Sequence, residues 1–410
     1  MVTDAYLPRA ADAVLSELLS SHPAVTVTGP RATGKTTTAA RLVQRQLRLA
    51  NPAVRTAVQA DPVTALVGPE PVLVDEWQLV PDVLSAIKEE VDARPRRGRF
   101  VVTGSARGEL DSPMWPGTGR LVPMRMYGLT EREIERRVDR SSWLASVLSG
   151  EVVPADTDDT LRTYVERALA SGFPEARLQL AGNARLRWLS AYVEQVVMRD
   201  VDLVGGVKDP FRLRRYLEAL ALNTAGVVDD VTLIQAAGVA KETARRFERL
   251  LTNLYVIEPL PAWTSNRLKR LVLAPKRFLV DTGLVAGVLG LTTEEVMLDG
   301  NLLGRILETF VVGQVRAELA LMAAPPRMHH LRTESGRHEI DLVIEIGARR
   351  LVAIEIKATS APSANDARHL VWFREQMGAS VRAAVLLHTG PTTFPIADGV
   401  WAVPIAALWS

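Results

Sequence analysis

The sequence contains no cysteine. Disulfides, thiolate zinc sites and cysteine nucleophiles are therefore excluded, and the composition suits a reducing cytosol, so we expect a cytoplasmic protein. Long apolar runs are missing too, since none approaches the roughly 20 residues that a bilayer span requires. The opening stretch, MVTDAYLPRAADAV, lacks a basic segment followed by an apolar one. We therefore expect no signal peptide and no membrane partner.

A large excess of charge of either sign is also absent. The 49 basic and 47 acidic residues give a formal charge of +2. Attraction to nucleic acid must therefore come from local patches. Lysine is scarce, because only seven lysines stand among the 49 basic residues. A lysine inside a motif is for that reason less typical of a generic surface cation. The length of 410 residues allows two to four domains.

The clearest motif lies near the N-terminus. Residues 25–28 are typical of a buried strand, residues 29–36 fit GxxxxGKT, and we expect a helix through Ala39, Ala40, Leu42 and Val43. In such a loop the backbone wraps phosphates, a lysine reaches the β- and γ-phosphates, and a threonine ligates magnesium. We expect the nucleotide to be held by the following residues: Gly29, Pro30, Arg31, Ala32, Thr33, Gly34, Lys35, Thr36 and Thr37.

A second acidic element follows in PVLVDEWQ, where an apolar strand ends in Asp75 and Glu76. Asp75 is expected to hold magnesium through water and Glu76 to polarise the attacking water, although adjacent acids also occur in ordinary loops. RFVVTGSAR predicts another buried strand. There Thr103 or Ser105 is placed either to sense the γ-phosphate or only to cap the strand end.

Alternating strands and helices predict an α/β fold with a parallel sheet and the ligand at the C-terminal ends of its strands. Arg107, and Arg120 in GTGRLVPM, are candidate arginine fingers. The acidic, proline-containing stretch GEVVPADTDDT indicates a linker or surface loop after this region.

The middle of the chain has the order of helices and turns that is typical of a helix-turn-helix. A helix, a short helix around VTLIQAAG, a turn at Gly238 and a longer helix from Lys241 are followed by YVIEPLPAW and KRLVLAPKRFLVD, which predict a two-stranded wing. DNA backbone contact is one interpretation, and a packing role with solvated arginines is the other. The candidate DNA-binding residues are Arg245, Arg246 and Arg249 on the longer helix, with Lys269, Arg270, Lys276 and Arg277 near the wing.

Near the C-terminus, EIDLVIEI and RLVAIEIK predict a hairpin around the turn-prone GAR. A turn at residues 347–349 places Asp341 opposite Glu355, and like charges so placed destabilise a strand pair. A magnesium ion would reverse that effect, and Lys357 on the same face could then orient a metal-bound water or stabilise developing negative charge. A solvated strand edge, on which Glu355 and Lys357 merely neutralise each other, is the alternative.

Taken together, the motifs resemble those of a large prokaryotic ATPase family that joins an AAA-like N-terminal domain to a C-terminal domain of unknown function. The similarity is ordered along the chain and rests on these segments: GPRATGKTT, VLVDEWQ, VVTGSA, GLTERE, YVEQVVMRDV, FLVDTGLVAGVLG, GRILETFVVGQV and EIDLVIE with LVAIEIKAT. The last part also resembles a restriction-endonuclease-like PD-(D/E)XK core.

This resemblance implies roles for particular residues. It implies ATP as the nucleotide, Arg120 as the arginine finger, and Asp341, Glu355 and Lys357 as a nuclease metal site. Such a core has an acid on a preceding helix, which Glu308 in RILETFVV matches. Magnesium is the implied ion, with manganese as a substitute at the nuclease-like site. DNA is an implied partner, and a homo-oligomer is left open.

We therefore predict an α/β protein with four parts: an AAA-like P-loop ATPase domain (1–140), a helical linker or lid (141–206), a winged-helix-like domain (207–290) and a restriction-endonuclease-like domain (291–410). The first functional hypothesis is an ATP-hydrolysing, DNA-binding protein with a magnesium-dependent nuclease-like domain. The alternatives are an ATP-switched DNA-binding regulator with an inactive nuclease fold, and an ATP-dependent protein-interaction switch.

Overall fold

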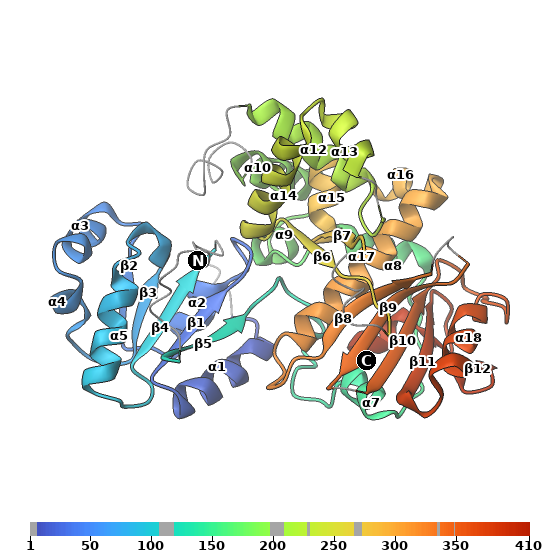
Figure 1. Cartoon of the computed structure of the whole chain (residues 1–410), viewed down its shortest axis with the longest axis horizontal. Coiled ribbons are helices and arrows are strands. Elements are labelled where there is room, and N and C mark those ends of the chain that lie inside the picture. The colour runs from blue at the N-terminus through green and yellow to red at the C-terminus, as the bar shows by residue number, and fades with distance from the viewer. Residues whose placement is uncertain are drawn as a thin grey trace. The chain divides into compact units, whose positions relative to one another are not determined.

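The structure is a computed structural model that describes residues 6–105, 119–196, 209–227, 230–265, 273–333, 337–347 and 349–410. The chain divides into two compact units (Figure 1). Unit 1 comprises Met1–Leu129 with Asn253–Tyr255, and unit 2 comprises Thr130–Thr252 with Val256–Ser410. The division into four domains is finer than this and stays a prediction.

Unit 1 is built on a five-stranded sheet with the order β2-β3-β4-β1-β5, in which every pairing is parallel. This is the parallel α/β sheet expected from the sequence. Its strands are β1 (Ala24–Thr28), β2 (Arg45–Arg48), β3 (Val72–Asp75), β4 (Phe100–Gly104) and β5 (Leu121–Arg125). Its helices are α1 (Ala10–Ser21), α2 (Lys35–Ala40), α3 (Pro52–Ala60), α4 (Pro62–Leu66), the 3-10 turn η1 (Trp77–Leu79) and α5 (Val83–Ala93).

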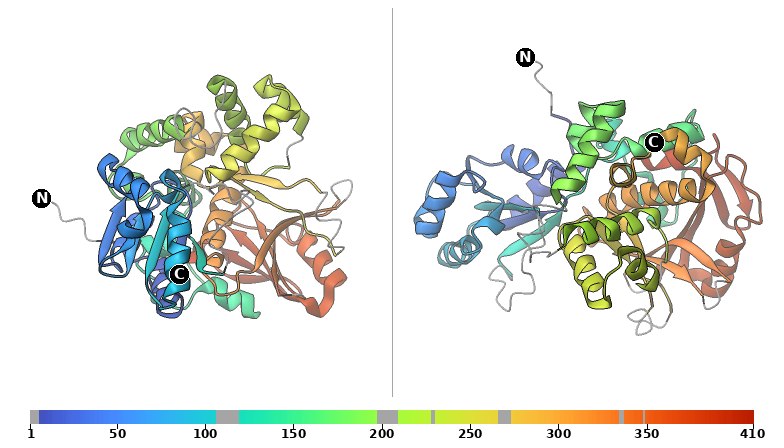
Figure 2. Two further views of the ribbon diagram at one scale, coloured as in Figure 1. Left: turned by 60° about the vertical axis from the view of Figure 1, so that its left-hand side comes forward. Right: turned by 90° about the horizontal axis from the view of Figure 1, so that it is seen from above.

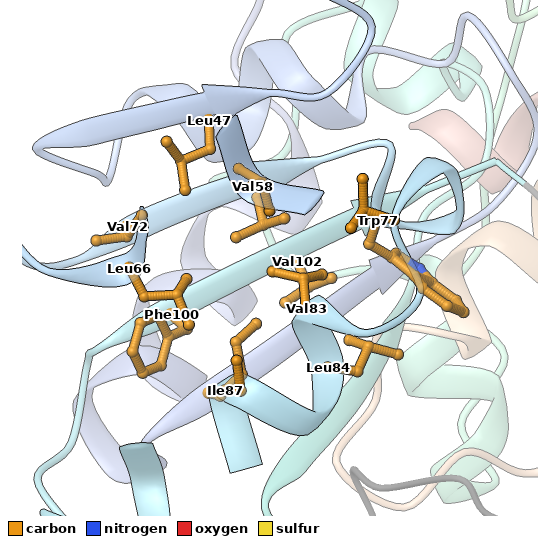
Figure 3. Close-up of a cluster of buried hydrophobic side chains, with 14 of the residues drawn as sticks. Leu47, Val58, Leu66, Val72, Trp77, Val83, Leu84, Ile87, Phe100 and Val102 are labelled. Atoms are coloured by element: carbon orange, nitrogen blue, oxygen red, sulfur yellow. The ribbon is translucent and has the colours of Figure 1, made fainter. Parts of the chain in front are cut away.

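One hydrophobic cluster packs between this sheet and its helices (Figure 3). Val72 and Val102 of neighbouring strands belong to this cluster together with Val83 and Ile87 of α5, and all four are fully buried. Burying one such side chain contributes about 1.5–3 kcal/mol. The cluster therefore fixes the central strands β3 and β4, whose C-terminal ends bear the acidic and hydroxyl residues of the candidate nucleotide site.

The helix after the P-loop is shorter than the sequence suggested. α2 ends at Ala40, so Leu42 and Val43 lie outside it. The backbone N–H of Gln44 donates to the carbonyl of Pro71, and the chain then pairs with β3 as the edge strand β2. Pairing with β3 thus overrides the helical appearance of this segment.

Unit 2 begins with helices. Its helices are α6 (Glu131–Ile134), α7 (Trp143–Ser149), α8 (Leu161–Leu169), α9 (Pro174–Leu178), α10 (Gly182–Gln195), α12 (Pro210–Leu222), α13 (Asp230–Ala237), α14 (Lys241–Asn253), α15 (Thr282–Leu289), α16 (Thr293–Leu298), α17 (Gly300–Leu319) and α18 (Arg368–Met377). Three of them, α12, α13 and α14, form the group that precedes two strands. β6 (Ile257–Leu260) and β7 (Lys276–Leu279) form the antiparallel pair expected after the longer helix.

The C-terminal part of unit 2 is a six-stranded mixed sheet with the order β12-β13-β11-β10-β9-β8. Its strands are β8 (Arg327–Arg332), β9 (Glu339–Ile346), β10 (Arg350–Ile356), β11 (Val381–His388), β12 (Phe394–Ala397) and β13 (Val400–Pro404). Two 3-10 turns, η5 (Gly378–Ser380) and η6 (Ile405–Trp409), complete this region. Figure 2 shows both sheets, blue to cyan and orange to red, from two more sides. Among the described residues, no helix has the length and apolar character that crossing a membrane requires.

Candidate functional site

The P-loop connects β1 to α2 through backbone conformations that require small residues. Gly29 and Gly34 have φ angles of 150° and 90°. A Cβ on Gly29 would lie 1.9 Å from the carbonyl oxygen of Met126, which is too close for any side chain. The Thr33 hydroxyl donates to the Pro30 carbonyl at 2.9 Å and closes the loop. The loop therefore presents backbone to a ligand, as phosphate binding requires.

Lys35 lies at the first position of α2 and is 5% exposed. Its Nζ donates to the carbonyl of Pro30 at 2.6 Å. Burial lowers the pKa of Lys35 to about 8, against the opposing effect of Glu76 and Asp75. An ammonium held by one backbone carbonyl in a buried loop can exchange that partner for a phosphate oxygen.

Asp75 at the end of β3 brings three predicted residues together. Its Oδ1 accepts 2.6 Å hydrogen bonds from the hydroxyls of Thr36 and Thr103. Asp75 pairs with Thr103 in the parallel register of β3 and β4, and this register explains the contact. Thr36 and Asp75 are thus positioned to share a magnesium ion. Thr103 contacts the acid here, so a role in sensing phosphate would require it to change partners.

Glu76 has a φ angle of 61°, an uncommon conformation for a residue with a side chain. Its Oε2 accepts a hydrogen bond from the Ser105 hydroxyl at 3.1 Å and another from Nε2 of Gln78. Residues held in such backbone conformations cluster at functional sites. Gln78 was not predicted from the sequence, although it lies only two residues after Glu76 in DEWQ.

Arg120 lies away from these residues. It precedes β5, whose first residue, Leu121, pairs with Ala24 at the start of β1, whereas the P-loop follows the other end of β1. A five-residue strand separates the two edges by roughly 16 Å. Arg120 instead forms a 2.8 Å ion pair with Asp92. The assignment of Arg120 as an arginine finger stays a prediction. Arg107, the other candidate, lies outside the described residues.

In unit 2 the C-terminal hairpin has the register expected from its turn. Leu342 pairs with Ile354, so the next position brings Asp341 opposite Glu355. Oδ2 of Asp341 accepts the backbone N–H of Ile356 at 3.0 Å. Lys357 lies with Nζ 2.7 Å from Oε1 of Glu355, which is 3% exposed. The predicted acids are thus buried and adjacent to the predicted lysine, which differs from a solvated strand edge.

Three further residues, Lys276, Glu308 and Glu339, complete this group. We call it the C-terminal acidic cluster: Lys276, Glu308, Glu339, Asp341, Glu355 and Lys357. Glu308 lies on α17, as the family resemblance implied. Nζ of Lys276 is 2.8 Å from Oε1 of Glu308, 3.1 Å from Oδ1 of Asp341 and 3.2 Å from Oε1 of Glu339. Lys276 was expected to approach DNA near the wing, and that expectation is wrong because its side chain is 2% exposed and binds these acids.

Burial and mutual repulsion set the protonation of the cluster. Burial raises the pKa of Glu355 to about 8, and Asp341 raises it while Lys357 lowers it. The pKa of Glu308 is raised well above its usual value by burial and then by Asp341. Burial alone would lower the pKa of Lys276, but Asp341, Glu308 and Glu339 together raise it. These three acids therefore favour the charged form of Lys276.

The cluster in this arrangement does not fit a divalent metal ion. One feature favours an ion, because Oε2 of Glu355 is buried and has no hydrogen-bond partner among the described residues. However, Lys276 already bridges Glu308 and Asp341, and the described part of the chain has no group of three or more histidine or acidic residues that could hold a metal. The assignment of Glu308, Asp341 and Glu355 as metal ligands stays a prediction.

The longer helix of the helix-turn-helix region, α14, separates apolar from basic residues. Its buried side chains are Ala244, Phe247, Leu250 and Leu251, whereas Arg245, Arg246 and Arg249 are exposed. Arg277 of β7 is not available to DNA, because it is 7% exposed and pairs with Asp230 and Glu248, both at 2.7 Å. Lys269 and Arg270 lie outside the described residues.

Comparisons with known proteins give three family matches. Residues 21–135 match an AAA domain, residues 161–295 match a domain of unknown function (DUF8612), and residues 303–408 match a second domain of unknown function (DUF4143). Uncharacterised proteins of Mycobacterium tuberculosis and Mycobacterium bovis are each 29% identical over 403 residues, covering 97% of this chain and 83% of each relative.

A solved Walker-type ATPase of Pyrococcus abyssi covers 69% of this chain and 96% of its own, with 12% identity and a TM-score of 0.39. That likeness is too low to support an argument. The AAA match spans the P-loop, Asp75 at the end of β3 and Glu76 directly after it. The N-terminal part of the chain is therefore similar to an AAA-type ATPase domain, and two regions that match domains of unknown function follow it.

Proposed function

We propose that this chain is an ATP-hydrolysing protein that binds DNA and has a nuclease-like C-terminal domain whose acids are neutralised internally. The observation that supports hydrolysis is the convergence of Lys35, Thr36, Asp75 and Glu76 at one edge of the parallel sheet. An AAA-type domain binds ATP with magnesium in general. In this chain Lys35 is hydrogen-bonded to the loop and Thr36 to Asp75, and Glu76 follows Asp75 directly.

Each residue then has a task in hydrolysis. Lys35 leaves the Pro30 carbonyl and donates to the β- and γ-phosphates. Thr36 and Asp75 would hold the magnesium, which would neutralise charge on the phosphates. Glu76 accepts a hydrogen bond from the attacking water and orients it, while Ser105 and Gln78 fix the carboxylate.

The DNA-binding part of the proposal rests on α14. Three exposed arginines occupy one helix whose opposite face is buried, and β6 and β7 follow it as the wing of a winged helix would. Guanidinium groups bind phosphate oxygens in a bidentate geometry. Backbone contact of this kind gives affinity without sequence specificity.

The test is the binding of a labelled 30-base-pair duplex by fluorescence anisotropy with ATP, with ADP and without nucleotide. We expect binding in low salt and an affinity that differs at least threefold between the ATP and ADP states. Absence of binding in all three states would overturn the DNA assignment and leave a nucleotide-dependent protein-interaction switch. Equal affinity in all three states would show that the nucleotide does not control DNA binding, while the DNA contact itself would be supported.

A second candidate is a magnesium-dependent nuclease. Glu355 favours it, because its buried Oε2 has no hydrogen-bond partner in the described part of the chain and its Oε1 lies beside Lys357. Metal-dependent nucleases combine such a carboxylate with a nearby lysine. Incubation of supercoiled plasmid with magnesium or manganese, with and without ATP, tests this activity. Cleavage that is lost in Asp341→Asn supports the nuclease, and intact plasmid in every condition supports the internally neutralised cluster.

A further inference from the structure

Lys276 occupies a position where its charge determines what else the C-terminal acidic cluster can bind. Its ammonium lies within 3.2 Å of oxygens from Glu308, Glu339 and Asp341, which come from α17 and β9. The side chains of Glu308 and Asp341 are only 13% and 12% exposed. Such acids cannot all be charged without a cation among them, because desolvation removes the screening that water provides.

The ammonium also occupies the position that a metal would need. A divalent ion bound by Glu308 and Asp341 would lie about 2.0–2.6 Å from an oxygen of each. Nζ of Lys276 contacts one oxygen of each at 2.8 and 3.1 Å, so ion and ammonium exclude each other sterically and by charge. Lys357 is different, because it pairs with Glu355 and not with the acids that Lys276 contacts.

Lys276 reaches the cluster from outside the six-stranded sheet. It begins β7, which pairs with β6 in the wing-like hairpin after α14. The ion pairs of Lys276 therefore join the winged-helix-like region to the sheet that bears Asp341 and Glu355. A movement of β7 would withdraw the cation and leave the acids unpaired.

We infer that Lys276 is an internal cation that fills the acidic cluster in place of a divalent metal, so that Glu308, Asp341 and Glu355 form a latent metal site. The site accepts a divalent ion of the size of magnesium or manganese only when Lys276 is withdrawn or removed. The inference deepens the proposed function, on which it rests for the identity of the nuclease-like site, and its test needs neither ATP nor DNA.

The test measures manganese binding to the full-length chain after nucleotide has been removed. Binding is detected as loss of the electron paramagnetic resonance signal of free Mn²⁺. Wild type should show no manganese site that depends on Asp341, as judged against Asp341→Asn. Lys276→Met should gain one site, with an affinity at least tenfold above the residual binding of wild type. The double variant Lys276→Met/Asp341→Asn should lose that gain.

Arg277→Met is the matched control. Arg277 is the next residue of β7, its side chain is 8% exposed, and it pairs with Asp230 and Glu248 outside the cluster. Its replacement removes a buried cation from the same strand without uncovering Glu308 or Asp341. Arg277→Met should therefore remain without a manganese site, and a site of equal affinity there would show that loosening of β7, not the loss of Lys276, creates the binding.

The remaining outcomes decide against the inference. An Asp341-dependent manganese site in wild type would show that Lys276 does not exclude the ion, and a folded Lys276→Met protein without a site would show that the acids do not form one. If Lys276→Met does not fold, Lys276→Met/Glu308→Gln removes one acid together with the lysine and leaves Asp341 and Glu355 as ligands. A manganese site in that variant supports the inference, and a folded variant without a site overturns it. Neither result depends on ATP hydrolysis or DNA binding.

Discussion

Nζ of Lys276 lies 3.1 Å from Oδ1 of Asp341, although the two residues are 65 positions apart in the sequence. This ion pair joins the region that matches the first domain of unknown function to the region that matches the second. Both residues belong to unit 2. The two regions therefore share a buried electrostatic contact.

Loss of Lys276 should destabilise unit 2 strongly. Lys276→Met leaves Glu308 and Asp341 buried without their shared cation, and breaking a buried ion pair in this way costs about 3–5 kcal/mol. Chemical denaturation of wild type, Lys276→Met, Glu308→Gln and the double variant measures the interaction free energy between Lys276 and Glu308. The double variant should be more stable than the sum of the single effects predicts, by at least about 1 kcal/mol. Additive effects would argue against a direct charge interaction.

DNA affinity should depend on the exposed arginines of α14. Replacing Arg245, Arg246 and Arg249 with alanine should weaken binding to unrelated duplexes alike, because phosphate contacts carry no sequence information. The slope of log affinity against log salt should flatten by roughly 0.9 for each lost contact. Anisotropy titrations at several salt concentrations measure both effects.

Arg94 and Arg96 provide the control for this experiment, since they are exposed arginines in unit 1 whose side chains are 59% and 71% exposed. Replacing them with alanine should leave the salt slope unchanged. If the α14 variant keeps the wild-type slope, its arginines belong to a solvated face that does not contact DNA.

Stability should fall in mild acid because of His330. Its side chain is buried, and burial followed by the charge of Lys276 lowers its pKa to about 4. The unfolded chain binds a proton near pH 6.5 that the folded chain resists, so the folded state loses stability as pH falls from about 6.5 toward 4. The full effect is on the order of 3 kcal/mol. In His330→Gln, which retains a donor toward the Ala274 carbonyl, denaturation between pH 7 and 4 should show a shallower loss. An unchanged slope would assign the acid sensitivity to other groups.

Local sequence patterns predicted the parts of the fold that depend on local interactions. The parallel sheet around the P-loop, the two wing strands and the hairpin register that places Asp341 opposite Glu355 follow from alternation, turn residues and motif spacing. Glu308 was found only through the family resemblance, because no spacing in the sequence links it to the hairpin.

What could not be predicted depends on long-range partners. Lys276 is one of two adjacent basic residues, and nothing in the local pattern distinguishes a buried cation from a DNA contact. Its three acids are supplied by α17 and β9, far along the chain. The same holds for β2, whose polar sequence has helical character and becomes a strand only because β3 offers an edge. The scarcity of lysine was the one available sign that Lys276 has a specific partner.

The most direct test of the central claim is steady-state ATP hydrolysis by wild type and Glu76→Gln, with nucleotide binding measured in parallel. Glu76→Gln should bind ATP with magnesium as wild type does and lose at least about 100-fold in turnover, because the base that orients water is gone. Lys35→Ala should weaken binding itself. Equal turnover in wild type and Glu76→Gln would contradict the assignment of this edge of the sheet as the hydrolytic site.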